Sequence, residues 1–292
     1  MEDTDELTRA QADGRAPYAV KRLYNADGSV GSHFLSRELY TFVESWETAM
    51  RDPRFAEIID NELAIERIAD EPLGHLALQA TSERARALFL AWLAFINVDL
   101  EPWTTGGSIH FRPHWARVLL LSQALADAEG LSDADACALA CAAAFHDSRR
   151  DNPYLDTGHG ARAARYYRDF CTDGAHGVPR ATRAGAALRF DARVYLAIRW
   201  HDRDDAEGEQ AIRSAFDADC SAELGDRSLA ATVPAGAATT PVDLYRLFKD
   251  ADALDRVRLG PHGLDERYLR SPHAGELVPF ARDLIARTRA RD

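Results

Sequence analysis

The sequence predicts an all-α protein. Apolar residues recur mainly at the three- and four-residue spacing of helices, strand-like alternation is scarce, and candidate caps stand at the ends of the longer apolar segments. The chain has 292 residues, of which 46% are hydrophobic, so it can form one large or two modest domains with a sizeable core. We expect an N-terminal helical region over residues 1–105 and a second helical domain over residues 106–292.

The N-terminal region shows helical spacing but no motif that indicates a function. Residues 1–32 are polar and mixed, with a turn signature at residues 25–28. Apolar residues at helical spacing predict packing helices around residues 42–50 and 88–96. A Gly- and Thr-rich segment at residues 101–107 predicts the loop between the two regions.

Helix signals follow one another through the second region. Pro113 suits a first helical turn, and Gly130 suits the end of that helix. Ser132 is a candidate N-cap, with Asp135 three residues later, for a helix that continues through the apolar run at residues 136–145.

The remaining elements are also predicted as helices, apart from one irregular segment. Asp156 or Thr157 could cap a helix over residues 158–170, and another is expected over residues 191–201. Residues 202–240 are less regular, and the part from residue 229 onward is rich in Ala, Gly and Thr. Thr240 and Pro241 then form the N-cap and first position of a further helix.

Composition and charge weigh against several classes of function. The formal net charge of -12 argues against binding to long nucleic acid or to an anionic membrane, although a locally basic pocket could still hold a small anion. The acidic start lacks the features of a signal peptide, and the longest apolar run, residues 136–145, is far shorter than the ~20 residues that span a bilayer. The cysteines lack zinc-ribbon spacing, so we expect free thiols in a reduced, cytoplasmic protein.

Histidine and aspartate residues recur at the ends or on the apolar faces of five predicted helices. They are His114, His146, Asp147, His159, His201, Asp250 and Asp252. An ionised aspartate beside Phe145 and an Ala-rich run would cost several kcal/mol unless it were paired or bound to a metal. Imidazole and carboxylate ligands suit divalent ions, so the pattern predicts a centre for one or two ions of Mn, Fe, Co, Ni, Zn or Mg.

These residues resemble the signature of the HD-domain superfamily of metal-dependent phosphohydrolases, in which a first His precedes a His-Asp pair and a distant Asp. The resemblance covers about residues 106–270 and implies an HD-domain-like helical bundle around one or two metals. It also implies that His114, His146, Asp147 and one late Asp are the ligands. We prefer Asp252, because residues 251–254 match the Ala-Asp-x-Leu form of the motif, and keep Asp250 as the alternative.

His159 and His201 are candidates for a second metal or for a direct catalytic role. His159 with the two residues after it resembles the helix start that supplies a ligand in dinuclear members of the superfamily. The segment from Trp200 to Arg203 resembles the later His segment of the branch that hydrolyses cyclic dinucleotides. That branch has a doubled His and a Gly-Tyr-Pro motif, which this chain lacks, so hydrolysis of cyclic di-GMP is not favoured. The alternative is that both histidines contact the phosphate or protonate the leaving oxygen.

Basic residues cluster around the motif and predict a small anionic, phosphorylated substrate. They are Arg117, Arg149, Arg150, Arg162, Arg165, Arg256 and Lys249. We expect Arg149 or Lys249 to contact phosphate; the alternative is that most of these groups are solvated or paired with neighbouring aspartates.

Three functions compete. The first is hydrolysis of a nucleotide or another small phosphorylated compound by a metal-activated water that Asp147 orients. The second is an HD-type di-iron oxygenase similar to myo-inositol oxygenase, and the third is a non-catalytic binding protein on the same bundle. The N-terminal region could pack on the bundle, cover the site or mediate formation of a homo-oligomer.

Overall fold

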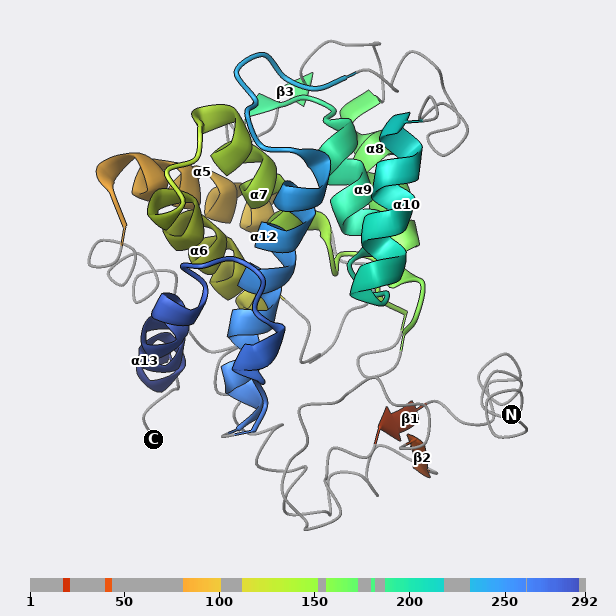
Figure 1. Cartoon of the computed structure of the whole chain (residues 1–292), viewed down its shortest axis with the longest axis vertical. Coiled ribbons are helices and arrows are strands. Elements are labelled where there is room, and N and C mark those ends of the chain that lie inside the picture. Colours follow the sequence, from red (N-terminus) through yellow and green to blue (C-terminus); the bar gives the residue numbers. More distant parts are fainter. Residues whose placement is uncertain are drawn as a thin grey trace.

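A computed structural model of the chain describes residues 18–21, 40–43, 81–100, 112–151, 156–172, 180–181, 187–217, 232–260 and 262–288. Most of this part of the chain is helical, and the helices pack into a bundle (Figure 1), which confirms the predicted all-α class. The loop predicted at residues 101–107 and the turn predicted at residues 25–28 lie outside the described residues.

The described elements are eight α-helices, three short 3-10 helices and two small antiparallel ribbons. The α-helices are α5 (Glu83–Val98), α6 (Arg112–Ala128), α7 (Asp133–Phe145), α8 (His159–Thr172), α9 (Ala192–Trp200), α10 (Asp205–Asp217), α12 (Pro241–Leu254) and α13 (Val278–Thr288). The 3-10 helices are η2 (Asp255–Leu259), η3 (Glu266–Tyr268) and η4 (Gly275–Leu277). The ribbons pair β1 (Tyr18–Lys21) with β2 (Tyr40–Val43) and β3 (Arg180–Ala181) with β4 (Ala187–Leu188).

Local capping determines where several of these helices begin and end. The hydroxyls of Ser132 and Thr240 each accept a hydrogen bond from the backbone N–H three residues later, which satisfies one of the free donors at a helix start. Asp191 caps α9 through its carboxylate. Gly130 adopts a φ of 63°, a left-handed conformation that ends a helix without strain in a glycine. These contacts confirm the predicted starts of α7 and α12 and the predicted end of α6.

Two segments differ from the prediction. Residues 40–43, expected to be helical, form β2; all four are aromatic or β-branched, which favours a strand once a partner strand is available. The irregular segment predicted at residues 202–240 contains α10. Only Ile212 and Ala215 of α10 are buried among its described side chains, and most of its other residues are polar or small, so the segment offers few apolar residues that predict a helix.

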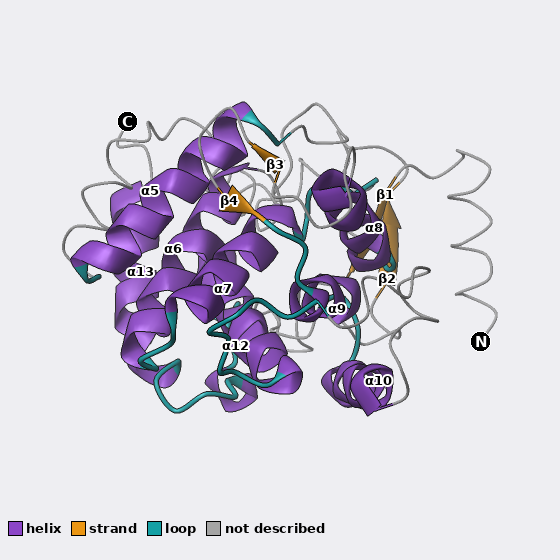
Figure 2. Cartoon of the chain, turned by 90° about the horizontal axis from the view of Figure 1, so that it is seen from above, coloured by secondary structure: helices purple, strands orange, loops and turns teal. Residues whose placement is uncertain are grey.

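The core lies between α6, α7, α9 and α12. Helix α12 packs against α6 and α7 as well as against α9, and in Figure 1 it lies between them; Figure 2 shows the same helices from above. Helix α7 is apolar on nearly all sides, as expected for a central helix. Helix α5 falls within the region predicted at residues 1–105, yet Phe95 lies 5.6 Å, between ring centroids, from Phe145 of α7. Helix α5 therefore belongs to the same core as the helices that follow it.

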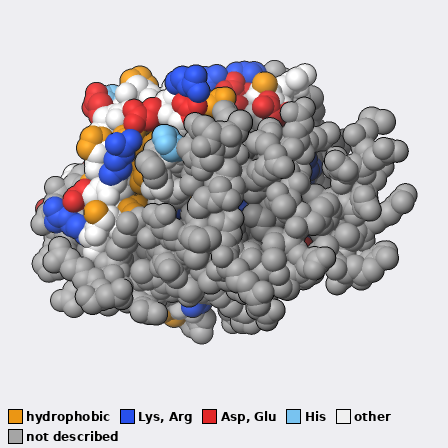
Figure 3. Space-filling view, turned by 90° about the horizontal axis from the view of Figure 1, so that it is seen from below, with side chains coloured by type: hydrophobic (Ala, Val, Ile, Leu, Met, Phe, Trp, Pro, Cys, Tyr) orange, Lys and Arg blue, Asp and Glu red, His pale blue; other side chains and the backbone are white. Residues whose placement is uncertain are grey.

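The surface of the described part of the chain carries charges of both signs. In the coloured part of Figure 3, basic and acidic side chains lie side by side. None of the described helices is both long enough and apolar enough to cross a membrane. Cys137, Cys141 and Cys171 are free thiols, as predicted, whereas Cys220 lies outside the described residues.

Candidate metal centre

Two of the four histidines predicted to form the site stand at equivalent positions, each directly after the last residue of a helix. His146 follows α7, and its Nδ1 lies 2.8 Å from the carbonyl oxygen of Ala143. His201 follows α9, and its Nδ1 lies 2.7 Å from the carbonyl oxygen of Ile198. Since a carbonyl can only accept, each ring carries its proton on Nδ1 and leaves the lone pair of Nε2 free to point into the bundle.

The other two histidines stand at helix starts and are fixed in the same way. His114 lies in the first turn of α6, with Nδ1 2.7 Å from Oδ2 of Asp255. His159 is the first residue of α8, and its Nδ1 contacts the carbonyl oxygen of Asp156. In metalloproteins the nitrogen that faces away from the ion is usually held by a carboxylate or a carbonyl. All four imidazoles therefore show the orientation that metal ligands require.

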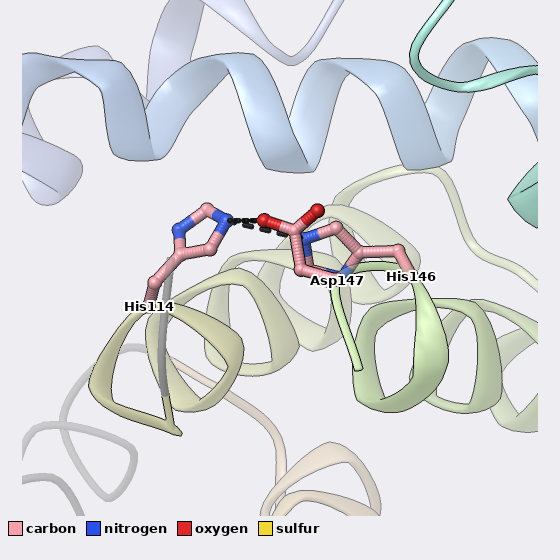
Figure 4. Close-up of side chains that lie close together, drawn as sticks. All are labelled: His114, His146 and Asp147. Atoms are coloured by element: carbon pink, nitrogen blue, oxygen red, sulfur yellow. Dashed lines mark hydrogen bonds and ion pairs between the residues drawn. The ribbon is translucent and has the colours of Figure 1, made fainter. Parts of the chain in front are cut away.

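The first group of ligand atoms comes from His114, His146 and Asp147. Figure 4 shows the three side chains pointing toward one another from α6 and from the end of α7. The two Nε2 atoms are 3.1 Å apart, and Oδ2 of Asp147 lies 3.5 Å from that of His114 and 3.6 Å from that of His146. Two ligands about 2.1 Å from one ion are about 3.0 to 3.4 Å apart, so the three atoms could hold one metal ion.

Helix α12 brings a fourth candidate ligand, Asp252, near this group. Oδ1 of Asp252 lies 3.4 Å from Nε2 of His114 and 3.9 Å from Nε2 of His146. The Asp252 side chain is 30% exposed, whereas the three other side chains are almost fully buried, so the group opens to solvent on the side of α12. The other candidate, Asp250, is engaged elsewhere: its carboxylate accepts hydrogen bonds from Arg270 and from the backbone N–H of Ser271. The geometry favours Asp252 of the two.

A second group shares Asp147 with the first. Oδ1 of Asp147 lies 2.9 Å from Nε2 of His159 and 3.5 Å from Nε2 of His201, and these two nitrogens are 2.9 Å apart. Among the described residues, these three side chains form the second set that could hold a metal. Asp147 thus directs one oxygen to each group, as a bridging carboxylate would.

The two histidines of the first group have pKa values shifted in opposite directions. Burial and Arg258 lower the pKa of His114, but hydrogen bonds to Asp147, Asp252 and Asp255 outweigh them and raise that pKa to about 10. Burial lowers the pKa of His146 to about 4, because the nearby carboxylates compensate only part of the cost of charging the ring. In the metal-free protein at neutral pH, the imidazole of His114 is therefore protonated and carries a positive charge beside these carboxylates.

The two basic residues predicted to contact phosphate have other partners. The guanidinium of Arg149 lies over the ring of Tyr166, with 3.2 Å from its central carbon to the ring centroid. Nζ of Lys249 donates to the carbonyl oxygen of His201 at 2.8 Å and pairs with Asp205 at 3.1 Å. Lys249 therefore holds the end of α9, where His201 stands.

Two residues of the site, Asp255 and Asp202, were not singled out from the sequence, and a third, Arg150, was named only within the basic cluster around the motif. Nη1 of Arg150 lies 3.2 Å from Oδ1 of Asp147 and 3.1 Å from Nε2 of His159. Asp255 stands behind His114, and Asp202 lies 3.6 Å from Nδ1 of His159. Sequence spacing offered a signal for each: Arg150 and Asp255 lie one turn after a predicted ligand, and Asp202 follows His201 as Asp147 follows His146.

Comparisons of the chain with known protein families, with curated protein sequences and with solved structures gave no match. The case for a function therefore rests on the residues of this chain and on their geometry.

Proposed function

We propose that the chain is a metal-dependent phosphohydrolase of the HD-domain kind, acting on a nucleotide or another small phosphorylated compound. One observation carries the proposal. His114, His146 and Asp147 converge in the core, each imidazole is oriented through Nδ1, and Asp252 completes the group at a partly exposed position. A buried, pre-oriented set that opens to solvent on one side suits a catalytic centre better than a purely structural one.

The ligand types define the class of ion. Two imidazoles with two carboxylates match Mn, Fe, Co, Ni or Zn, whereas Mg usually prefers oxygen ligands alone. Such an ion, when bound, would act as a Lewis acid and lower the pKa of a water molecule toward neutrality.

The remaining polar groups of the site suit phosphoryl chemistry. Asp147 is positioned to hold the ion through Oδ2 and to accept a hydrogen bond through Oδ1. His159 and His201 present Nε2 atoms that can exchange a proton with a substrate oxygen. Arg150 adds a permanent positive charge beside them, which would stabilise negative charge on phosphoryl oxygens.

The proposal is tested with a panel of nucleotides and other phosphorylated compounds, each assayed with Mn, Co, Ni, Mg and Fe. We expect release of phosphate or of a nucleotide product in at least one combination, and loss of that activity in Asp147→Ala. The matched control is Asp169→Ala, because Asp169 lies on the surface of α8 and pairs with Arg168. Full activity in the Asp147 variant would refute the assignment.

A second function, a di-iron oxygenase, is favoured by one observation: the second group could hold a second ion bridged by Asp147. The two proposals differ in what they require. An oxygenase would bind two irons and show an absorption change with O₂, whereas a phosphohydrolase would show metal-dependent turnover without O₂. The same preparation can be tested for both.

A further inference from the structure

We infer that Arg150 takes the place of a second cation, so that the chain holds a single metal ion, in the group of His114, His146, Asp147 and Asp252. The inference rests on the proposed function and deepens it, because it assigns the second group to substrate binding. It starts from the fact that two of the three atoms that would bind a second ion already contact the guanidinium of Arg150.

Arg150 contacts two of the three ligand atoms of the second group. Nη1 lies 3.2 Å from Oδ1 of Asp147, the oxygen directed to that group, and 3.1 Å from Nε2 of His159. The same Nη1 lies 3.4 Å from Nδ1 of His159, so the guanidinium rests against the imidazole ring. A second ion would compete with this donor for the lone pairs of Asp147 and His159.

The positive charge of the Arg150 guanidinium is permanent. A guanidinium does not lose its proton in proteins, and the Arg150 side chain is only 10% exposed. Repulsion between a buried guanidinium and a nearby divalent ion is weakly screened. Arg150 therefore opposes a second ion through charge as well as through direct contact.

The arginines near the first group are placed differently from Arg150. Arg117 and Arg258 lie on its side of the bundle, but their guanidinium groups contact Asp255, which stands behind His114. The carboxylate of Asp255 thus lies between these arginines and the His114 ring, and it partly offsets their charge. The arrangement leaves the first group suited to a divalent ion and gives the second group its own cation.

The chain offers a matched pair of neighbouring arginines. Arg149 and Arg150 are consecutive in the turn after α7, but Arg149 lies over Tyr166 whereas Arg150 reaches Asp147. Replacing either by Met removes one positive charge at nearly the same place in the chain. Only the Arg150 change frees the ligand atoms of the second group.

The consequence for substrate binding is specific. Nη1 of Arg150 and Nε2 of His201 both lie close to Nε2 of His159, at 3.1 Å and 2.9 Å, beside Asp147. This combination of a fixed cation and two proton-exchanging rings matches the oxygens of a phosphoryl group. The second group would then hold the substrate phosphate beside the ion of the first group, because Asp147 belongs to both groups.

The test counts ions rather than turnover. The full-length protein is stripped with a chelator, loaded with excess Mn²⁺, freed of unbound ion and analysed for Mn per chain and by electron paramagnetic resonance. We expect one Mn per chain in the unaltered protein and in Arg149→Met, and two in Arg150→Met. The Arg150 variant should also show the spectrum of two coupled ions, because Asp147 would bridge them.

Each other outcome overturns the inference. Two ions in the unaltered chain, or one ion in a folded Arg150→Met protein, would mean that Arg150 does not exclude a second ion. If Arg150→Met does not fold, Arg150→Gln removes the same charge with a polar side chain, and the same two-ion result is expected. No bound Mn in the unaltered chain would refute the proposed function itself, and the inference would fail with it.

Discussion

Asp255 lies directly behind His114, with Oδ2 2.7 Å from Nδ1 of the ring, and its other oxygen accepts a 2.6 Å hydrogen bond from Nε of Arg117. The carboxylate therefore fixes the direction of the ring and makes Nε2 a stronger donor of its lone pair. The contact joins the start of α6 to the residue that follows α12, so it also holds these two helices together.

The first prediction follows from this contact. Asp255→Asn keeps the size of the side chain but removes the charge that supports His114. We expect Mn²⁺ affinity to fall by about 10- to 100-fold, the usual effect of losing such an outer partner. The measurement is a competition titration with a fluorescent chelator on protein shown by circular dichroism to be folded. Asp283→Asn, at a surface pair with Arg287, is the control and should leave affinity unchanged. An unchanged affinity in the Asp255 variant would contradict the role assigned to it.

The second prediction concerns pH. The carboxylates around His114 raise its pKa to about 10, so in the metal-free protein the ring is protonated at pH 7, whereas His146, with a pKa of about 4, is already neutral. A metal must displace the proton of His114, so binding at pH 7 should release about one proton per ion. Affinity should rise by about tenfold per pH unit from pH 7 and level off near pH 10.

The same pKa sets the sign of a stability effect in the metal-free protein. A raised folded-state pKa means that protonated His114 stabilises the fold fully below its ordinary pKa of about 6.5. This stabilising contribution of protonated His114 is lost as pH rises through about 10.

The release of a proton on metal binding is measured by calorimetric titration of Mn²⁺ in two buffers with different ionisation enthalpies. An affinity that does not change between pH 7 and 9 would refute the expected exchange.

The third prediction concerns the close approach of α8 to the end of α9. A Cβ added at Gly160 would lie 2.7 Å from the carbonyl oxygen of Ile198 and 2.8 Å from Oδ1 of Asp202. Because backbone cannot yield easily, Gly160→Ala should lower the free energy of unfolding by about 1–3 kcal/mol. It should also displace His159, the preceding residue, from His201. Denaturant titration measures the stability of the variant.

Gly275→Ala provides the comparison, since a Cβ at Gly275 would meet nothing within 4 Å. We expect its stability to stay within about 0.5 kcal/mol of the unaltered protein. If both variants unfold at the same denaturant concentration, α8 and α9 do not approach as closely as Gly160 indicates.

The sequence predicts those parts of the site that local patterns determine. Ser132 and Thr240 were recognisable as caps because their partners lie three residues away. The position of His146 and Asp147 at the end of α7 follows from the apolar run before them. These features need no knowledge of the rest of the chain.

What depends on direction and on distant partners escaped prediction. Arg149 and Arg150 are equivalent in sequence, and only the turn after α7 sends one to Tyr166 and the other to Asp147. The pairing of Asp255 with His114 joins residues 141 positions apart, which no local periodicity encodes. Helix α10 was missed because it contains few large apolar residues and few of its side chains are buried.

The last prediction separates the two aspartates of α12. Residues two apart on a helix point in different directions, so Asp250 and Asp252 cannot both face the same ion. Oδ1 of Asp252 faces His114 at 3.4 Å, whereas Asp250 is fully buried and pairs with Arg270 at 2.9 Å. Asp252→Asn should therefore weaken Mn²⁺ binding by at least about tenfold and lower stability less than Asp250→Asn does, because the Asp252 side chain is partly exposed.

Asp250→Asn should have the opposite profile. Loss of the charge leaves Arg270 with Asp205 as its remaining ion-pair partner, and we expect the free energy of unfolding to fall by about 1–3 kcal/mol. Any protein that remains folded should bind Mn²⁺ with unchanged affinity, because the carboxylate of Asp250 contacts Arg270 and Ser271 rather than the histidines. Metal affinity and denaturant stability, measured on both variants, give a crossed pattern. If Asp250→Asn lost metal while Asp252→Asn kept it, the assignment of the fourth ligand would be reversed.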